Sequence, residues 1–542
     1  RAYGKYGVDG LISTAFGQKS PNSVTQNNSH RQYLTGQLIA EYKGVFGKHD
    51  INVLGGWSAE ENLYEDLQGK RTNIVGNELP ALNLGDTDGW SNAADENEWA
   101  LLSGFMRASY AFAAKYLVEV NFRADASSRF SKKNRWGVFP SASVGWRITE
   151  EKFMQNQHIF DNLKLRASWG QLGNQNGLGL YDHIASYNIN GYYPFKSELG
   201  QWAVISKLPS ESRTWETVEV KNIAVDMAFL RNRLTVTGEY FIKKNKDMLV
   251  SIEIPSIIGI DVPTGNYGEL KVKGWEVTVG WQDKIKDFSY GARFNLSDQK
   301  DKLVDYGVEY NGFVAGVNQK VQGYSLGSIF GYRTDGYFTS EEEVKNSAAF
   351  NKAITGVGDI KYIDKDGDGK ISAPNDLEYL GTTTPRYTFG LNLTAAWKGF
   401  DLGVLLQGVG KRNFYLSSEV MNPYYATWNN FSYKMHNDYW TPENPNAAFP
   451  RYYAGANHNY QISDHWLQNA AYVRLKNLQL GYTISPKLTK SWGIQRLRVY
   501  FSGDNLCEYS KLNDNFDPEL SNINGYVYPI MRNFSFGINV TL

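Results

Sequence analysis

The last ten residues, 533–542, read NFSFGINVTL and alternate strictly between two kinds of side chain. Large apolar residues take every second position, namely Phe534, Phe536, Ile538, Val540 and Leu542. A period of two predicts a strand whose faces meet different surroundings. In a soluble sandwich the apolar face would point into a core, whereas in a transmembrane barrel it would face lipid. A bare apolar edge invites aggregation, and closing a barrel removes it, so this strand favours the barrel.

Composition narrows the classes of protein that the chain can belong to. The 542 residues are 42% hydrophobic, and 56 basic residues balance 56 acidic ones. A nucleic-acid-binding surface would leave a basic excess, so we do not expect one. The single cysteine, Cys507, excludes an intrachain disulfide. The sequence holds no apolar run of about 18 residues and no signal peptide, so a membrane role requires a β-barrel, and the chain reads as a mature or internal fragment.

The same alternation recurs along the chain. We count about sixteen candidate strands of about 12 to 18 residues, longer than the ~5–6 of globular sheets. In one hairpin, Val118 and its i±2 neighbours alternate with a face that carries Glu119. In another, Tyr240 and its neighbours alternate with a face that carries Glu239. Charged side chains on the second face are costly in a packed core but are accommodated in a wet lumen.

The connections between strands alternate in length. Short turns are expected at 48–50, 114–115, 231–232, 284–286 and 398–399, and long loops at about 67–97, 176–214, 250–268, 307–383, 417–469 and 509–529. Two further connections on the short side, 149–161 and 485–495, are long enough for a helical turn. Short turns at one end and long loops at the other are typical of outer-membrane barrels, with long loops extracellular and the C-terminus periplasmic. The alternative, a soluble all-β protein such as a propeller or stacked sandwiches, would use shorter strands and closer turns.

Six motifs follow one another along the chain. They are LKLRASWGQLGNQ at 163–175, QGYSLGSIFGYRTDGYF at 322–338, DIKYIDKDGDGKISAPNDLEYLGTTTPRYTFG at 359–390, DYWTPENPNAAFPR at 438–451, YVRLKNLQLGYT at 472–483 and RVYFSGDNLCEYSKLNDNFDPE at 498–519. Together, and in this order, they resemble the SusC/RagA family of TonB-linked outer-membrane transporters. The resemblance implies an all-β, transmembrane antiparallel β-barrel of about 22 strands around a plug. The chain, 1–542, is then the C-terminal part of the barrel, with about sixteen strands. We expect the plug and the TonB-contacting segment to lie outside it.

The resemblance also implies function and partners. It implies TonB-dependent active import of a large nutrient, most commonly an oligosaccharide and otherwise a peptide. It further implies a SusD-like surface lipoprotein as a lid, contact with TonB through the N-terminal part, and outer-membrane lipid around the barrel. A dimer of transporter–lid pairs is left open. The competing hypotheses are a passive, porin-like outer-membrane channel and a soluble β-protein; the sequence shows no HExxH motif, nucleophile elbow or P-loop, so we do not expect an enzyme.

The segment DKDGDGKI at 364–371 has the spacing of a calcium loop. Carboxylates at positions 1, 3 and 5 (Asp364, Asp366, Asp368), a glycine at 6 and the carbonyl of Lys370 at 7 match the pattern. Position 12 is asparagine, so we expect Asp376, one place later, as the closing ligand. The alternative is an acidic glycine-rich turn without metal.

The long loops are rich in aromatic residues, which suit a sugar, a peptide or a protein lid equally well. We single out a set of ligand or lid contacts in these loops: Trp202, Tyr424, Tyr425, Trp428, Tyr439, Trp440 and Arg451. The alternative for any one of them is loop packing or an interfacial belt, since aromatic belts are general in barrels.

Overall fold

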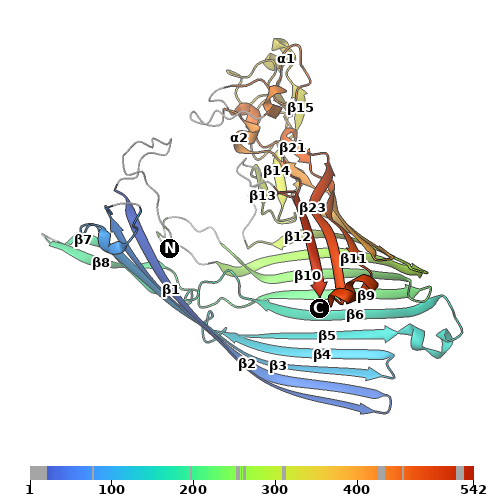
Figure 1. The fold of residues 1–542 in the computed structure, drawn as a ribbon. Helices are drawn as coiled ribbons and strands as arrows, with labels where there is room; N and C mark the ends of the chain where they lie inside the picture. Colours follow the sequence, from blue (N-terminus) through green and yellow to red (C-terminus); the bar gives the residue numbers. More distant parts are fainter. Residues whose placement is uncertain are drawn as a thin grey trace.

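A computed structural model describes residues 21–75, 78–195, 198–251, 257, 259, 264–307, 313–424, 434–453, 457–514, 516–520 and 530–542. Fifteen antiparallel strands form one large sheet, in which neighbouring strands follow one another in chain order and the strands of the long connections are left out. They are β1 (Ser23–Phe46), β2 (His49–Thr72), β3 (Ser91–Phe112), β4 (Tyr116–Ser127), β5 (Trp136–Arg147), β6 (Phe160–Asn174), β9 (Glu216–Phe229), β10 (Leu234–Val250), β11 (Gly265–Ile285), β12 (Phe288–Asp305), β18 (Arg386–Trp397), β19 (Phe400–Lys411), β22 (Tyr472–Thr483), β23 (Arg496–Ser510) and β24 (Asn533–Thr541). The sheet curves into the wall of a barrel, with β1 and β24 as its two described edges (Figure 1).

The strand register confirms the two faces that alternation predicts. Residues directly opposite in an antiparallel pair share a face. Val118 lies opposite Tyr110 and Val144, whereas Glu119 lies opposite Ser109 and Ser143. Val118 remains 41% exposed, as a lipid-facing side chain of an isolated barrel must be. The apolar face is therefore the outer face, and the polar face lines the lumen.

The short turns between strands use left-handed backbone. Ala113 and Ala114 join β3 to β4 at φ +51° and +55°, and Lys398 and Gly399 join β18 to β19 at +44° and +94°. The two longer connections on this side hold the helical turns that their length predicts. These are η2 (Ile148–Glu150) and η3 (Lys152–Met154) in the first, and α3 (Pro486–Thr489) and η8 (Lys490–Trp492) in the second.

One expected loop boundary is wrong. The sequence predicts a loop at 67–97, but β2 continues to Thr72 and β3 begins at Ser91, with Gln68 opposite Ala93 and Lys70 opposite Ser91. The strands continue beyond any apolar band because β1, β2 and β3 satisfy one another's backbone groups as a three-stranded ribbon. The loop itself is η1 (Leu82–Leu84) and its flanks.

The long connections carry their own structure. Between β6 and β9 lies a hairpin, β7 (Ser186–Phe195) and β8 (Glu198–Lys207). Between β12 and β18 lie β13 (Gly316–Gln319), β14 (Ser328–Tyr332), β15 (Thr334–Tyr337), α1 (Glu341–Asn346), β16 (Ile360–Tyr362) and β17 (Leu377–Thr382). Between β19 and β22 lie β20 (Asn413–Tyr415), α2 (Ser418–Met421), η5 (Lys434–Asn437), η6 (His458–Tyr460), η7 (Asp464–Trp466) and β21 (Leu467–Asn469). Within the described ranges, no helix is both long and apolar enough to cross a membrane.

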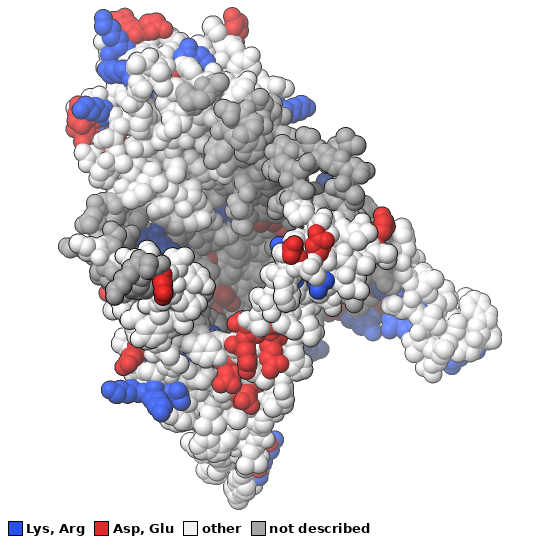
Figure 2. Space-filling model, turned by 90° about the vertical axis from the view of Figure 1, so that its left-hand side faces the viewer, with Lys and Arg blue, Asp and Glu red and all other residues white. Residues whose placement is uncertain are grey.

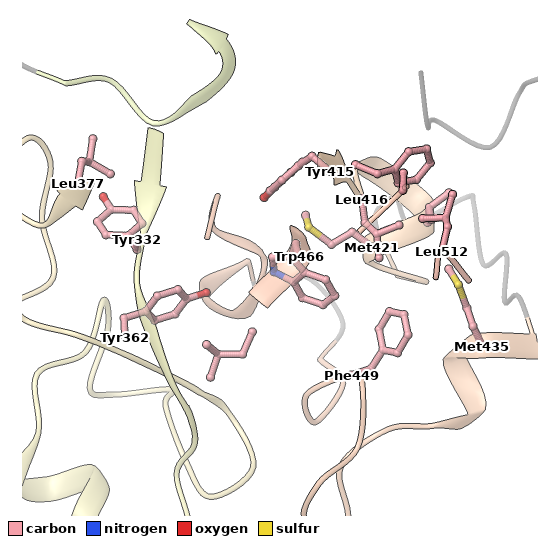
Figure 3. Close-up of a cluster of buried hydrophobic side chains, with 14 of the residues drawn as sticks. Tyr332, Tyr362, Leu377, Tyr415, Leu416, Met421, Met435, Phe449, Trp466 and Leu512 are labelled. Atoms are coloured by element: carbon pink, nitrogen blue, oxygen red, sulfur yellow. The ribbon is translucent and has the colours of Figure 1, made fainter. Parts of the chain in front are cut away.

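Two of these connections and the segment after β23 pack into one body, which we call the loop layer. Trp466 is 1% exposed at its centre, and Tyr362, Phe449 and Met421 approach it from different segments (Figure 3). Leu512, from the segment after β23, joins the same cluster. Figure 1 places this body at one end of the barrel wall, above β12 to β23. Three loops that are far apart in sequence thus share one hydrophobic core.

Candidate functional site

The lumen wall holds charged side chains in pairs. Arg166 on β6 donates to Asp226 on β9 at 3.0 Å and to Glu239 on β10 at 3.1 Å. Arg123 and Asp125 pair at 2.8 Å along β4. Charged groups on the inner face that pair within a strand or across neighbouring strands are typical of a water-filled lumen. The inner face of the wall is therefore polar, unlike the apolar core of a soluble sandwich.

The acidic loop at 364–376 gathers part of the predicted ligand set. Asp364, Asp366 and Asp376 each offer a carboxylate oxygen, and these three atoms lie within 4.8 Å of one another. Asp376, the residue after the expected twelfth place, is 1% exposed and lies on the buried side of the loop. Asp368 is outside this group and accepts the backbone N–H of Lys370 at 2.8 Å. Three of the five predicted residues therefore converge.

Backbone donors already hold these carboxylates. Asp364 accepts the N–H groups of Gly369 at 2.8 Å and Gly367 at 2.7 Å, and these bonds, the one from Gly369 most, lower the pKa of Asp364. Asp376 accepts from Lys365 and Ser372, both at 2.7 Å. Both glycines have positive φ, which the tight turn requires. Carboxylate oxygens are the hard donors that Ca²⁺ prefers, and three of them converge here, so the residues present fit that ion.

The predicted aromatic contacts fall into separate groups. Tyr424 and Tyr439 both pack on Tyr452, with ring centroids 6.0 and 5.3 Å from it. Both are partly exposed, at 44% and 43%. Trp202 lies apart on β8, where its indole covers Gly191. Tyr425 and Trp428 lie outside the described residues.

Trp440 and Arg451 meet at the turn around Gly358. A Cβ on Gly358 would come within 2.3 Å of the Trp440 ring, so only glycine fits beneath that indole. Arg451 donates its backbone N–H to the Gly358 carbonyl at 3.0 Å and stacks on Tyr453 at 4.6 Å. These two residues therefore fix the loops to each other, which is the packing alternative that the sequence left open.

Asp359 is a buried centre that the sequence did not single out. It is fully buried and accepts hydrogen bonds from Tyr453 at 3.0 Å and from Asn459 at 2.9 Å. His458 Nε2 lies 3.0 Å away, and the Arg451 guanidinium lies 3.5 Å away. One carboxylate thus ties the loop before the acidic turn to the loop after β19. Its position at the head of the motif at 359–390 was the available indication.

Arg474 is the second residue that the sequence did not single out. Its side chain is fully buried on β22 and reaches Asp517 at 2.8 Å, Glu519 at 2.9 Å and Glu508 at 3.1 Å. Lys476 also binds Glu519, at 2.7 Å. The FDPE segment at 516–519 is therefore held to the lumen wall by charge.

The chain resembles known proteins over nearly its whole length. The family described as TonB dependent receptor-like, beta-barrel, matches residues 1–506. TonB-dependent receptor P26 of Formosa agariphila is 30% identical over 530 residues, which are 92% of this chain and 52% of that protein. TonB-dependent receptor SusC of Bacteroides thetaiotaomicron is 28% identical over 463 residues, which are 81% of this chain and 43% of that protein. The chain thus spans about half the length of the curated relatives that it matches.

Solved structures confirm the fold. The structure of the RagAB peptide transporter superposes with a TM-score of 0.83 at 23% identity, covering 97% of this chain and 57% of the other. The RagAB peptide importer in its closed-closed state gives 0.81 at 24% identity, covering 95% and 56%.

Proposed function

Because the chain belongs to the TonB-dependent receptor family of outer-membrane β-barrels, we propose that it forms the wall and outer loops of an energised importer. The importer would take up a large nutrient across the outer membrane, with energy relayed by TonB. The observation that carries this proposal is a polar, ion-paired lumen wall with a loop layer at one end that shares a single hydrophobic core. In this arrangement the loop layer faces outward and the short turns face the periplasm.

An oligosaccharide is the proposed cargo, and a peptide is the second candidate. The surface of the loop layer presents Tyr424 and Tyr439 around Tyr452, and the Asn444 amide beside them donates to Asp438 and to the Tyr439 carbonyl. Aromatic faces stack on the C–H faces of sugars, while polar side chains hydrogen-bond their hydroxyl edges. The RagAB neighbours, named as a peptide transporter and importer, are the reason to keep the peptide in the test.

A SusD-like surface lipoprotein is the proposed lid. Such a partner binds more tightly to loops that are already ordered, because ordering mobile loops on binding costs conformational entropy. The shared core around Trp466 and the buried centre at Asp359 supply that rigidity. We also propose that the loop at 364–376 binds Ca²⁺ through Asp364, Asp366 and Asp376, where the ion would stabilise the loop layer.

The experiment uses the full-length receptor purified from the outer membrane in mild detergent. Intact-mass analysis of every co-purifying chain, followed by titration calorimetry against oligosaccharide and peptide panels, tests lid and cargo together. Uptake that disappears when TonB is deleted supports the importer. A receptor that conducts ions continuously in planar bilayers and needs no TonB would instead be the passive channel.

A further inference from the structure

The outer wall of β9 to β12 carries a concentration of lysines, which we call the lysine face. Its members are Lys221, Lys244, Lys271, Lys273, Lys300 and Lys302. These four strands lie side by side (Figure 1). Cross-strand pairing places the lysines in two neighbouring rows on the same side of the sheet as Tyr240 and Trp275. The other side of these strands is the luminal one, where Glu239 meets Arg166.

The register sets like charges directly against each other. Lys271 lies between Lys244 on one neighbouring strand and Lys302 on the other. Lys273 lies opposite Lys300 in the adjacent row. Directly opposite side chains have Cβ atoms about 4.5–5.5 Å apart, and like charges in such pairs destabilise a sheet. A single pair of this kind needs no explanation, but three in two rows call for a compensating anion.

The protein itself supplies little compensation. Glu219 pairs with Lys221 at 3.1 Å, although Lys246 also holds it at 2.5 Å, and Glu269 lies 3.7 Å from Lys244. In the part of the chain that the structure describes, Lys271, Lys273, Lys300 and Lys302 make no ion pair. Three of these four are exposed, and Lys271 is half-buried.

Two further acidic residues lie near the rows. Asp298 lies in the row below, opposite Trp275, and is bound by Arg386. Asp305 lies opposite Glu269 in the row above. Neither Asp298 nor Asp305 lies within the two rows, so the excess of positive charge there remains.

The height of the rows on the wall indicates what the anion is. From Trp275 to the end of β11 at Ile285 is about 11 residues, and a transmembrane strand needs about 9–11. Tyr240 and Trp275 lie opposite each other in the row immediately below the lysines, and Trp169 lies opposite Lys221 at the side of the lysine face. Aromatic side chains at this height are typical of a membrane–water boundary. The ammonium groups therefore lie at the level of lipid head groups, just above the acyl chains.

We propose that the lysine face binds the phosphate groups of a phosphorylated glycolipid in the outer leaflet, whose acyl chains lie along Tyr240 and Trp275 below it. Lysine ammonium groups bind phosphate as point charges, and four of them here form no ion pair with any described residue. The inference rests on the proposed function only for orientation, since it requires the loop-layer end to face outward. A bound lipid at this position would fix the depth of the barrel and shield the repelling lysines.

The test compares the double variant Lys273→Gln/Lys300→Gln with a matched luminal control, Lys164→Gln/Lys243→Gln. Full-length receptor in detergent is titrated with purified phosphorylated glycolipid, with the same glycolipid after dephosphorylation, with phosphatidylglycerol and with inorganic phosphate. Affinity for the phosphorylated form is expected to fall about five-fold for each lysine removed, and so roughly 25-fold for the pair. The luminal control should bind as the parent does.

Equal binding of the phosphorylated and dephosphorylated glycolipid would overturn the proposal, and so would equal binding of phosphatidylglycerol. Binding of inorganic phosphate with the same affinity would reduce the face to a general anion site and would also overturn it. Loss of a co-purifying protein, with lipid binding unchanged, would assign the face to that protein. The double variant relieves repulsion, so its melting temperature in lipid-free detergent should not fall. Cargo uptake measured with the same variants separates failure of this inference from failure of the importer.

Discussion

Replacing Arg474 with methionine should release the segment at 511–520 from the barrel wall. In the native protein this fully buried guanidinium reaches three carboxylates, those of Glu508, Asp517 and Glu519. Methionine fills similar space but leaves Asp517 and Glu508 facing each other without a cation. Glu519 keeps Lys476 at 2.7 Å. The loss therefore falls on the middle of the segment and not on the strand itself.

The magnitude follows from burial. Removing one partner of a buried ion pair costs about 3–5 kcal/mol, because the other charge is left uncompensated. Here the side chains of Asp517 and Glu508 are 15% and 35% exposed, so water screens part of the charge that is left without a partner. We expect about 2–3 kcal/mol, which corresponds to roughly 30- to 150-fold easier local opening of the segment.

Hydrogen–deuterium exchange of peptides covering 511–520 measures that opening directly. Glu508→Gln is the control, since it removes the most exposed of the three anions and should change exchange several-fold less. Faster exchange should also reach the peptide around Phe414, whose ring packs 5.7 Å from Phe516. Unchanged exchange at 511–520 in the methionine variant would refute the reasoning, because the segment would then be held by apolar packing alone.

Three further predictions test the wall, the acidic loop and the loop layer. Val118→Arg, on the lipid face, should destabilise the barrel by about 2–4 kcal/mol and block its assembly, whereas Glu119→Gln in the lumen should leave assembly unchanged. A heat-modifiability assay of the folded barrel measures both, and reversed phenotypes would mean that the two faces are assigned the wrong way round. Asp366→Ala should lower the melting temperature only when calcium is present, and a parent that melts identically with and without chelator has no such site. Burial lowers the pKa of His436, so the unfolded state takes up the proton first as the pH falls. The stability present above about pH 6.5 should therefore decline below that pH, as followed by loop proteolysis, and His436→Phe should lose this dependence.

The strands could be predicted because their pattern is local. Alternation along β4 and β10 assigns each residue to a face, and the register confirms both assignments. The turns and the two helical connections followed from length alone. Strand ends were less predictable: β2 and β3 continue past the expected limit because pairing with a neighbour, and not apolar character, keeps their backbone satisfied.

The interactions between loops could not be predicted, because they join residues that are distant in sequence. Asp359 accepts hydrogen bonds from Tyr453 and Asn459, which lie in a loop almost one hundred residues later. Arg474 donates to Asp517, which lies 43 residues later, beyond the end of β23. No periodicity connects such partners, since each loop adapts to the shape of the others. The acidic turn was the exception, because its three converging carboxylates lie within one short segment.

A neutral composition also conceals how charge is arranged around the wall. Basic and acidic residues balance at 56 each, which is why the sequence predicts no basic nucleic-acid surface. On β2 and β3, however, Glu65 lies opposite Glu96 and Asp66 lies opposite Asp95, and acidic side chains gather on the face of the molecule seen in Figure 2. On β11 and β12, lysines oppose lysines at the top of the apolar band. Since an interaction between exposed charges fades over about 10 Å at ordinary salt, these regions do not neutralise each other across the barrel. Each charged region must be balanced by counter-ions, lipid or a partner in contact with it. The wall therefore presents chemically different sides to its surroundings, although the net charge of the chain is zero.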